Sequence, residues 1–158
     1  MKDSLLTGVS FGLTSAIITT LGLMVGLNAG THSRIVVLSG ILTIAIADAF
    51  SDALGIHVSE EAKNINTVKQ IWMATVSTFL SKFLFAMTFV VPVLLLSLST
   101  AIIVSLVWGL SVLAVLSYII ARSQHEKAWK VIGEHLLIAI VVIAATYWVG
   151  RWIETLFA

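Results

Sequence analysis

Two aspartates one helical turn apart, Asp48 and Asp52, interrupt an otherwise apolar part of the sequence. The residues before them, 35–47, carry no charged side chain. On a helix the two carboxylates lie about 40° apart around the axis, so both face the same way. Carboxylate oxygens at this spacing suit a hard or borderline divalent cation. The pair can also exchange protons, because two close carboxylates need not be ionised together.

A third ionisable residue, Lys82, lies in a later apolar stretch. Asp48 and Lys82 are each seventeen residues from Ile65, the middle of the polar segment between the two stretches. In a symmetric helical hairpin they reach similar depth and can neutralise each other. An ionisable side chain in hydrocarbon is costly and usually faces protein or water. Two interpretations stay open: the aspartates line a transport path, or they hold helices together with Lys82.

Three further polar residues, His57, Glu60 and Glu61, follow where this apolar stretch ends. They could collect a metal ion at the inner mouth of a path. A solvated acidic helix end beside Lys63 explains them equally well.

The first apolar stretch contributes hydroxyls and glycines. Thr14 and Ser15 could line a narrow polar path, or they could bond back to carbonyls of their own helix. The glycines of this stretch favour the close approach of another helix, from this chain or from a symmetry mate. They are Gly8, Gly12, Gly22 and Gly26.

The composition predicts a membrane protein. The chain has 158 residues, of which 59% are hydrophobic and 11% charged, whereas soluble domains carry about 25% charged residues. The net charge of +1 gives no indication of nucleic-acid binding. Because the sequence has no cysteine, disulfides, thiolate metal sites and cysteine nucleophiles are excluded.

Five apolar stretches are long enough to cross a bilayer, which takes roughly 20 residues each. They cover about residues 5–30, 35–57, 71–98, 99–121 and 133–153. We therefore expect an all-α integral membrane protein in which residues 1–158 form a single transmembrane domain. With the N-terminus in the cytoplasm, the inner segments hold six Lys and Arg residues and the outer segments two. This excess favours a cytoplasmic N-terminus.

Four segments of the sequence together resemble the vacuolar iron transporter family. They are FGLTSAIITTLGLMVGL (11–27), VLSGILTIAIADAFSDALGIHVSEEAK (37–63), ATVSTFLSKFLFAMTFVVPVLLL (74–96) and EHLLIAIVVIAATYWVGRWI (134–153). The resemblance implies five helices per protomer, a homodimer, and a path for Fe²⁺ or Mn²⁺ near the dimer interface. It also implies that metal leaves the cytosol in exchange for protons, as a transported substrate and not as a permanently bound cofactor.

The chain departs from the family's pattern at the expected metal path. Ser15-Ala16 stands where relatives usually have Asp-Gly, and Asp52 stands where they usually have Met. Lys82 replaces a residue that is commonly apolar, and the long cytoplasmic metal-binding insertion is absent. In one interpretation the lost carboxylate has been relocated to the second helix. In the other, Lys82 occupies the cation's place and blocks the path.

Two functions follow from these alternatives. The first is a proton-coupled carrier of divalent metal, and the small size and short loops favour a prokaryotic plasma membrane. The second is a non-transporting membrane scaffold or regulator, in which Lys82 neutralises the buried carboxylates. An enzyme is not expected: an intramembrane aspartyl protease needs aspartates from two helices, and both aspartates here lie on one.

Overall fold

The computed structural model describes residues 2–157, which form helices and short turns without any strand. The helices are α1 (Lys2–Thr31), α2 (Arg34–Ala62), α3 (Val68–Thr88), α4 (Val90–Leu95), α5 (Leu98–Ser123) and α6 (Ala128–Phe157). Helices α3 and α4 follow one another and together make one long segment. Within the described residues, five segments are thus long and apolar enough to cross a membrane. The expected all-helical fold is confirmed, as is the expected number of apolar segments long enough to cross a membrane.

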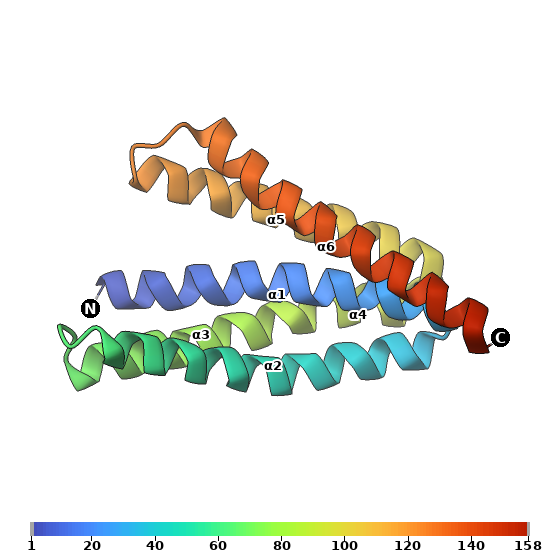
Figure 1. Ribbon diagram of the computed structural model, residues 1–158, viewed down its shortest axis with the longest axis horizontal. Coiled ribbons are helices and arrows are strands. Elements are labelled where there is room, and N and C mark those ends of the chain that lie inside the picture. Colours follow the sequence, from blue (N-terminus) through green and yellow to red (C-terminus); the bar gives the residue numbers. More distant parts are fainter. Residues whose placement is uncertain (1, 158) are drawn as a thin grey trace.

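Pro92 explains why the third span is divided at Phe89. A proline has no backbone N–H, and its ring clashes with the carbonyl four residues earlier, which here belongs to Thr88, the last residue of α3. At the break, the Phe89 N–H bonds to the carbonyl of Ala86, three residues back, in place of the α-helical spacing of four. The chain then continues in the same direction as α4 (Figure 1).

Several helix ends differ from the expected boundaries. Helix α2 continues to Ala62, past the expected end at residue 57, and α6 begins at Ala128 in place of residue 133. The third span ends at Leu95, three residues earlier than expected. Apolar composition marks the middle of a helix, but polar residues such as Glu and Lys also favour helix and extend its ends. The turn after α2 is closed by Asn64, whose φ of 54° stops the helix.

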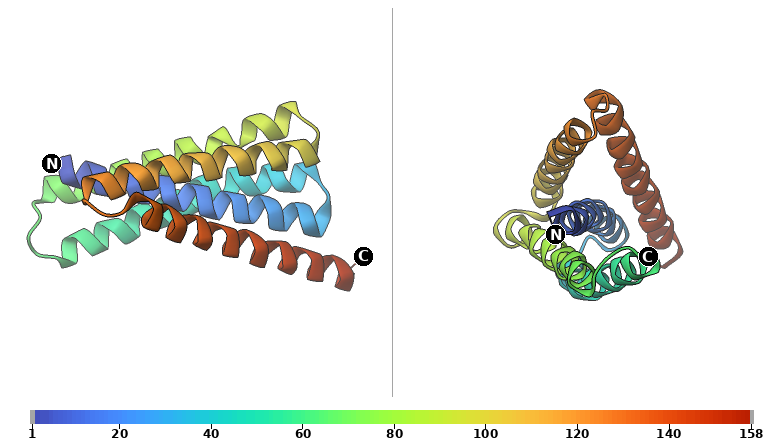
Figure 2. Two further views of the ribbon diagram at one scale, coloured as in Figure 1. Left: turned by 90° about the horizontal axis from the view of Figure 1, so that it is seen from above. Right: turned by 90° about the vertical axis from the view of Figure 1, so that its left-hand side faces the viewer.

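Helix α1 lies at the centre of the molecule, surrounded by the other helices in the end-on view (Figure 2). Half of its apolar window is buried, against 11% for α6. Its glycines make this possible: Gly8 and Gly12 lie against α3, while Gly22 and Gly26 lie against α6. The close helix approach expected from these glycines is therefore found, with partners inside this chain.

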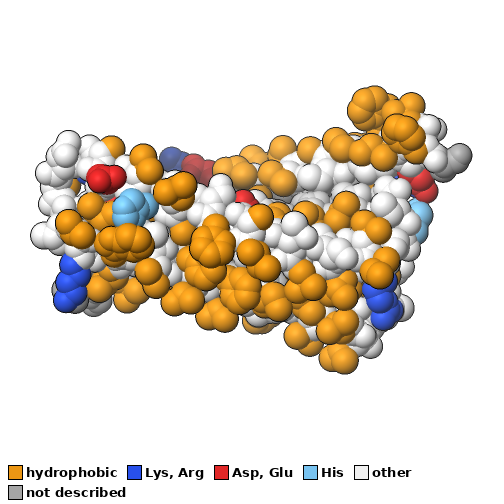
Figure 3. Space-filling view, turned by 90° about the horizontal axis from the view of Figure 1, so that it is seen from below, with side chains coloured by type: hydrophobic (Ala, Val, Ile, Leu, Met, Phe, Trp, Pro, Cys, Tyr) orange, Lys and Arg blue, Asp and Glu red, His pale blue; other side chains and the backbone are white. Residues whose placement is uncertain are grey.

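The surface carries a broad apolar band between two polar ends. Large hydrophobic side chains of every span are exposed, including Phe50, Leu84 and Trp148. In Figure 3 the charged side chains gather at the two ends, and a small acidic patch shows near the middle. This distribution is compatible with lipid around the middle of the helices.

Candidate functional site

The ammonium of Lys82 is buried between three helices. Lys82 is only 1% exposed. Its Nζ donates a hydrogen bond of 2.8 Å to Ser15 Oγ of α1. It also donates a hydrogen bond to Asp52 Oδ2 of α2. The same Nζ lies 2.5 Å from Asp48 Oδ2. The structure thus brings together four of the predicted residues.

Small residues on the three helices place these groups within reach of one another. On α2, the buried residues Ala45, Ala49 and Ala53 recur every four positions beside the two aspartates, and their short side chains let α2 approach closely. On α1, a Cβ at Gly12 would lie 2.6 Å from the Thr78 carbonyl oxygen and 3.2 Å from the Lys82 amide nitrogen. This contact brings α1 against α3 and places Ser15, three residues later, beside Lys82.

The two aspartates differ in their contact with Lys82. The Asp52 carboxylate accepts a hydrogen bond from the ammonium. The Asp48 Oδ2 atom is buried and close to the ammonium, yet it has no hydrogen-bond partner. The angle of this contact is therefore unfavourable, and charge attraction accounts for it. Asp48 is also the more exposed of the two, with 28% of its side chain accessible against 20% for Asp52.

Asp48 opens into a groove between α1 and α2 with a volume of about 670 Å³. Four hydroxyl side chains line the groove with it: Thr19, Ser39, Thr43 and Ser51. Ser39, Thr43 and Ser51 were not among the residues expected from the sequence. The sequence pattern that could have indicated them is a run of small and polar residues at every fourth position of α2. All of these residues are exposed in the structure: Ser39, Thr43, Ala47, Ser51, Gly55 and Ser59.

Thr14 is not part of this cluster. It is half-buried on α1, and it takes part in none of the hydrogen bonds to Lys82 or the aspartates. Of the two α1 hydroxyls expected in the path, only Ser15 reaches the charged groups.

The three residues expected at the inner mouth do not assemble into a metal site. His57 Nδ1 lies 2.9 Å from Thr75 Oγ1. Glu60 is buried and binds Lys63 Nζ at 2.5 Å, while Glu61 is exposed. Within residues 2–157, no three His, Asp or Glu side chains lie close enough to hold a metal ion. On α2, His57 faces α3 and Glu60 faces the turn that follows, so the three residues do not form a single ligand set in this structure.

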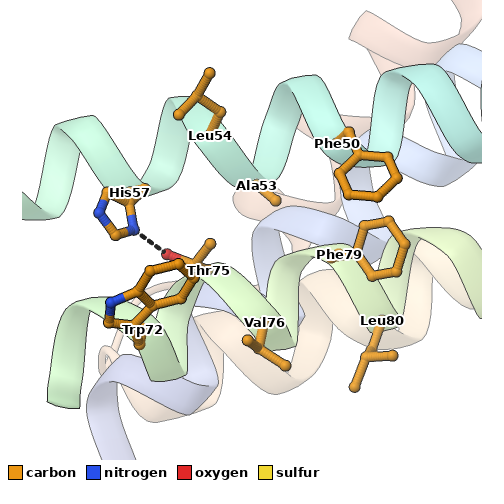
Figure 4. Close-up of a pocket in the computed structure, with 9 residues that line it drawn as sticks. All are labelled: Phe50, Ala53, Leu54, His57, Trp72, Thr75, Val76, Phe79 and Leu80. Atoms are coloured by element: carbon orange, nitrogen blue, oxygen red, sulfur yellow. Dashed lines mark hydrogen bonds between the residues drawn. The ribbon is translucent and has the colours of Figure 1, made fainter.

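The His57 ring links α2 to α3 through its contacts with two α3 residues. The Thr75 hydroxyl donates its hydrogen to the Ile71 carbonyl at 2.8 Å, so it accepts the bond from His57 Nδ1. The ring also meets Trp72 edge to face, with centroids 4.9 Å apart. Figure 4 shows both residues at one end of an apolar pocket of about 440 Å³ between α2 and α3.

No protein-family model, curated protein or solved structure matches the chain. The site is therefore interpreted from its own chemistry. It combines two carboxylates, one ammonium and a row of hydroxyls, halfway along helices that are otherwise apolar.

Proposed function

We propose that the chain is an integral membrane carrier that moves a divalent transition metal, Fe²⁺ or Mn²⁺, out of the cytosol in exchange for protons. One observation carries the proposal: two carboxylates face a single buried ammonium, and the more exposed one opens into a hydroxyl-lined groove. A lysine that only joined helices would need one carboxylate. A second carboxylate at this depth is costly and indicates a cation path.

The ligand atoms support a hard or borderline metal ion. The groove offers carboxylate and hydroxyl oxygens from Asp48, Ser51 and Thr19. Oxygen ligands suit Mn²⁺ and, among borderline metals, Fe²⁺. The sequence resemblance to vacuolar iron transporters supports the same metals and supports exchange against protons.

The arrangement of charges supports an N-terminus in the cytoplasm. The turn after α2 carries Lys63, and the segment from α5 to α6 carries Arg122, Lys127 and Lys130. These residues lie at the same end as the start of α1, because α2 and α5 end there (Figure 1). Clusters of Lys and Arg mark the cytoplasmic side, and the short turns favour a prokaryotic plasma membrane.

The exposed row of small residues on α2 supports a homodimer. Small residues at every fourth position let a second helix approach closely, and residues 39–59 present such a row beside the groove. A second copy packed here would cover the hydroxyls and enclose the Asp48 carboxylate. The path would then lie near the dimer interface, as the resemblance implies.

One observation favours the second candidate, a scaffold or regulator without transport. Lys82 already occupies the position between the aspartates that a metal ion would take. If the ammonium stays bound to both carboxylates, neither is free to bind a metal ion, and the cluster only holds three helices together.

Uptake of Fe²⁺ and Mn²⁺ into proteoliposomes, with and without a pH gradient, separates the two candidates. A carrier takes up metal, responds to the gradient, and loses uptake when Asp48→Asn and Asp52→Asn are combined. Glu126→Gln, which removes an exposed carboxylate from the turn between α5 and α6, serves as the matched control and retains uptake. No uptake of either metal by folded wild-type protein would favour the scaffold.

A further inference from the structure

We infer that Asp48 is the carboxylate that binds the cation, while Lys82 stays with Asp52 and Ser15 as a fixed charge that weakens the site for divalent ions. This inference rests on the proposed function and deepens it. It assigns separate tasks to the two aspartates.

The contacts of Lys82 are unequal. Ser15 and Asp52 both accept hydrogen bonds from Nζ, from two different helices. Asp48 has the charge contact alone, and its Oδ2 lacks a hydrogen-bond partner. A charge-assisted hydrogen bond is stronger than a misaligned contact. Asp48 is therefore the carboxylate that Lys82 releases at the lower cost.

Asp48 is also more accessible to a cation than Asp52 is. Asp48 lines the groove between α1 and α2, whereas Asp52 is not among the residues that line it. The second oxygen of Asp48, Oδ1, has no hydrogen-bond partner and is not buried. A cation in the groove can therefore reach Asp48 without moving Lys82 from Asp52.

The cluster of Asp48, Asp52 and Lys82 contains one more negative group than positive groups. Two carboxylates face one ammonium, and the other charged side chains that the structure describes lie within about two turns of a helix end. With every group ionised, the middle of the molecule carries a formal charge of −1. We assign this surplus charge to Asp48, because both aspartates lie close to the ammonium but only Asp52 also accepts a hydrogen bond from it.

The groove can supply neutral oxygens to the same cation. Thr19 Oγ1 donates its hydrogen to the Ser15 carbonyl at 2.8 Å, so its oxygen is left as an acceptor. Ser51, one turn after Asp48 on α2, presents a second hydroxyl to the groove. One carboxylate with neutral oxygens binds a partly hydrated cation and holds a divalent ion less firmly than two carboxylates would.

Lys82 then determines how firmly the site holds its cargo. Its ammonium neutralises the second carboxylate and repels any cation at Asp48 over a short distance in a poorly screened environment. Weak binding is useful to a carrier, because the cargo must leave on the other side. Removing this charge should convert the cluster into a two-carboxylate site that binds divalent metal more tightly.

Binding of Mn²⁺ to the purified full-length protein in nanodiscs, followed by the electron paramagnetic resonance signal of free Mn²⁺, tests the inference. We expect Asp48→Asn to weaken binding by at least about tenfold and Lys82→Met to tighten it on the order of ten- to a hundredfold. The double variant Asp52→Asn/Lys82→Met keeps Asp48 and the net charge of −1. We expect it to bind within about threefold of wild type.

The double variant also protects the test against misfolding, because it leaves no unpaired charge in place of the Lys82–Asp52 pair. Binding that survives Asp48→Asn, or that disappears in the folded double variant, would overturn the assignment. So would the absence of Mn²⁺ binding in every folded variant. Binding in the expected order without Mn²⁺ uptake would overturn the carrier and leave the assignment of Asp48 intact. Uptake that tolerates Asp48→Asn would do the reverse.

Discussion

Gly150 of α6 lies so close to Gly26 of α1 that a Cβ added to Gly150 would be 2.2 Å from the Gly26 carbonyl oxygen. The opposed atom belongs to the backbone, so it cannot turn aside as a flexible side chain would. Helix α6 is the least buried of the five spans. This close backbone contact is one of the places where α6 packs against the central helix.

Replacing Gly150 by alanine should separate α6 from α1. We expect Gly150→Ala to lower the free energy of unfolding by about 1–3 kcal/mol, because overpacking a tight contact forces the backbone apart. Thermal unfolding of the purified protein measures the change. Gly133→Ala is the matched control on the same helix, because a Cβ there meets no atom within 4 Å. Equal losses in the two variants would show that the contact with Gly26 does not matter.

Removing the Ser15 hydroxyl should destabilise the charged cluster. Ser15 Oγ accepts a 2.8 Å hydrogen bond from the buried Lys82 ammonium. We expect Ser15→Ala to cost about 1–3 kcal/mol of unfolding free energy, the usual penalty for leaving a buried donor without a partner. Unfolding by denaturant measures it. Thr14→Ala removes a neighbouring hydroxyl that does not touch Lys82, and a comparable loss in that variant would contradict the assignment.

His57 should act as a link between α2 and α3 and not as a metal ligand. Its Nδ1 is bonded to Thr75 Oγ1 at 2.9 Å. In a double-mutant cycle with His57→Ala and Thr75→Val, we expect a coupling energy of about 1 kcal/mol. The Mn²⁺ concentration that gives half-maximal uptake should not change in His57→Ala. A rise of tenfold or more would return His57 to the metal path.

The sequence was sufficient to predict five apolar helices of membrane-spanning length and to place Asp48 and Lys82 at similar depth, where the structure finds them in contact. Both predictions depend on quantities that one chain carries in itself: the length of each apolar stretch, and the equal distance of the two residues from Ile65. A helical hairpin brings positions at equal distance from its turn to the same depth, whatever lies around it.

The contacts of Ser15 and Glu60 could not be predicted from the sequence in this way. The position of Ser15 beside Lys82 depends on how α1 is rotated against α3, which is decided by the fit of Gly8 and Gly12. Glu60 is buried because the turn folds back and Asn66 Nδ2 donates a 2.8 Å hydrogen bond to its carboxylate. Both depend on the packing of segments that are distant in the sequence or irregular.

The groove beside Asp48 should contain water even though it lies halfway along apolar helices. The hydroxyls of Thr43 and Ser51 line it, and a cation can reach Asp48 only through a hydrated space. Because the sequence has no cysteine, single cysteines report their own surroundings. A thiol in water ionises and reacts with a charged maleimide, whereas a thiol in hydrocarbon stays protonated and unreactive.

We expect Thr43→Cys and Ser51→Cys to be labelled in intact proteoliposomes, and Leu84→Cys, at a position on α3 that is 61% exposed, to remain unlabelled. Leu84 lies on the apolar surface, so exposure alone does not bring water to it. Added Mn²⁺ should slow labelling of Ser51→Cys, which is adjacent to the Asp48 carboxylate in the groove. If Thr43→Cys and Ser51→Cys were as inert as Leu84→Cys, the groove would hold no accessible water, and Asp48 would have no route to a cation. The cluster around Lys82 would then serve only to hold α1, α2 and α3 together.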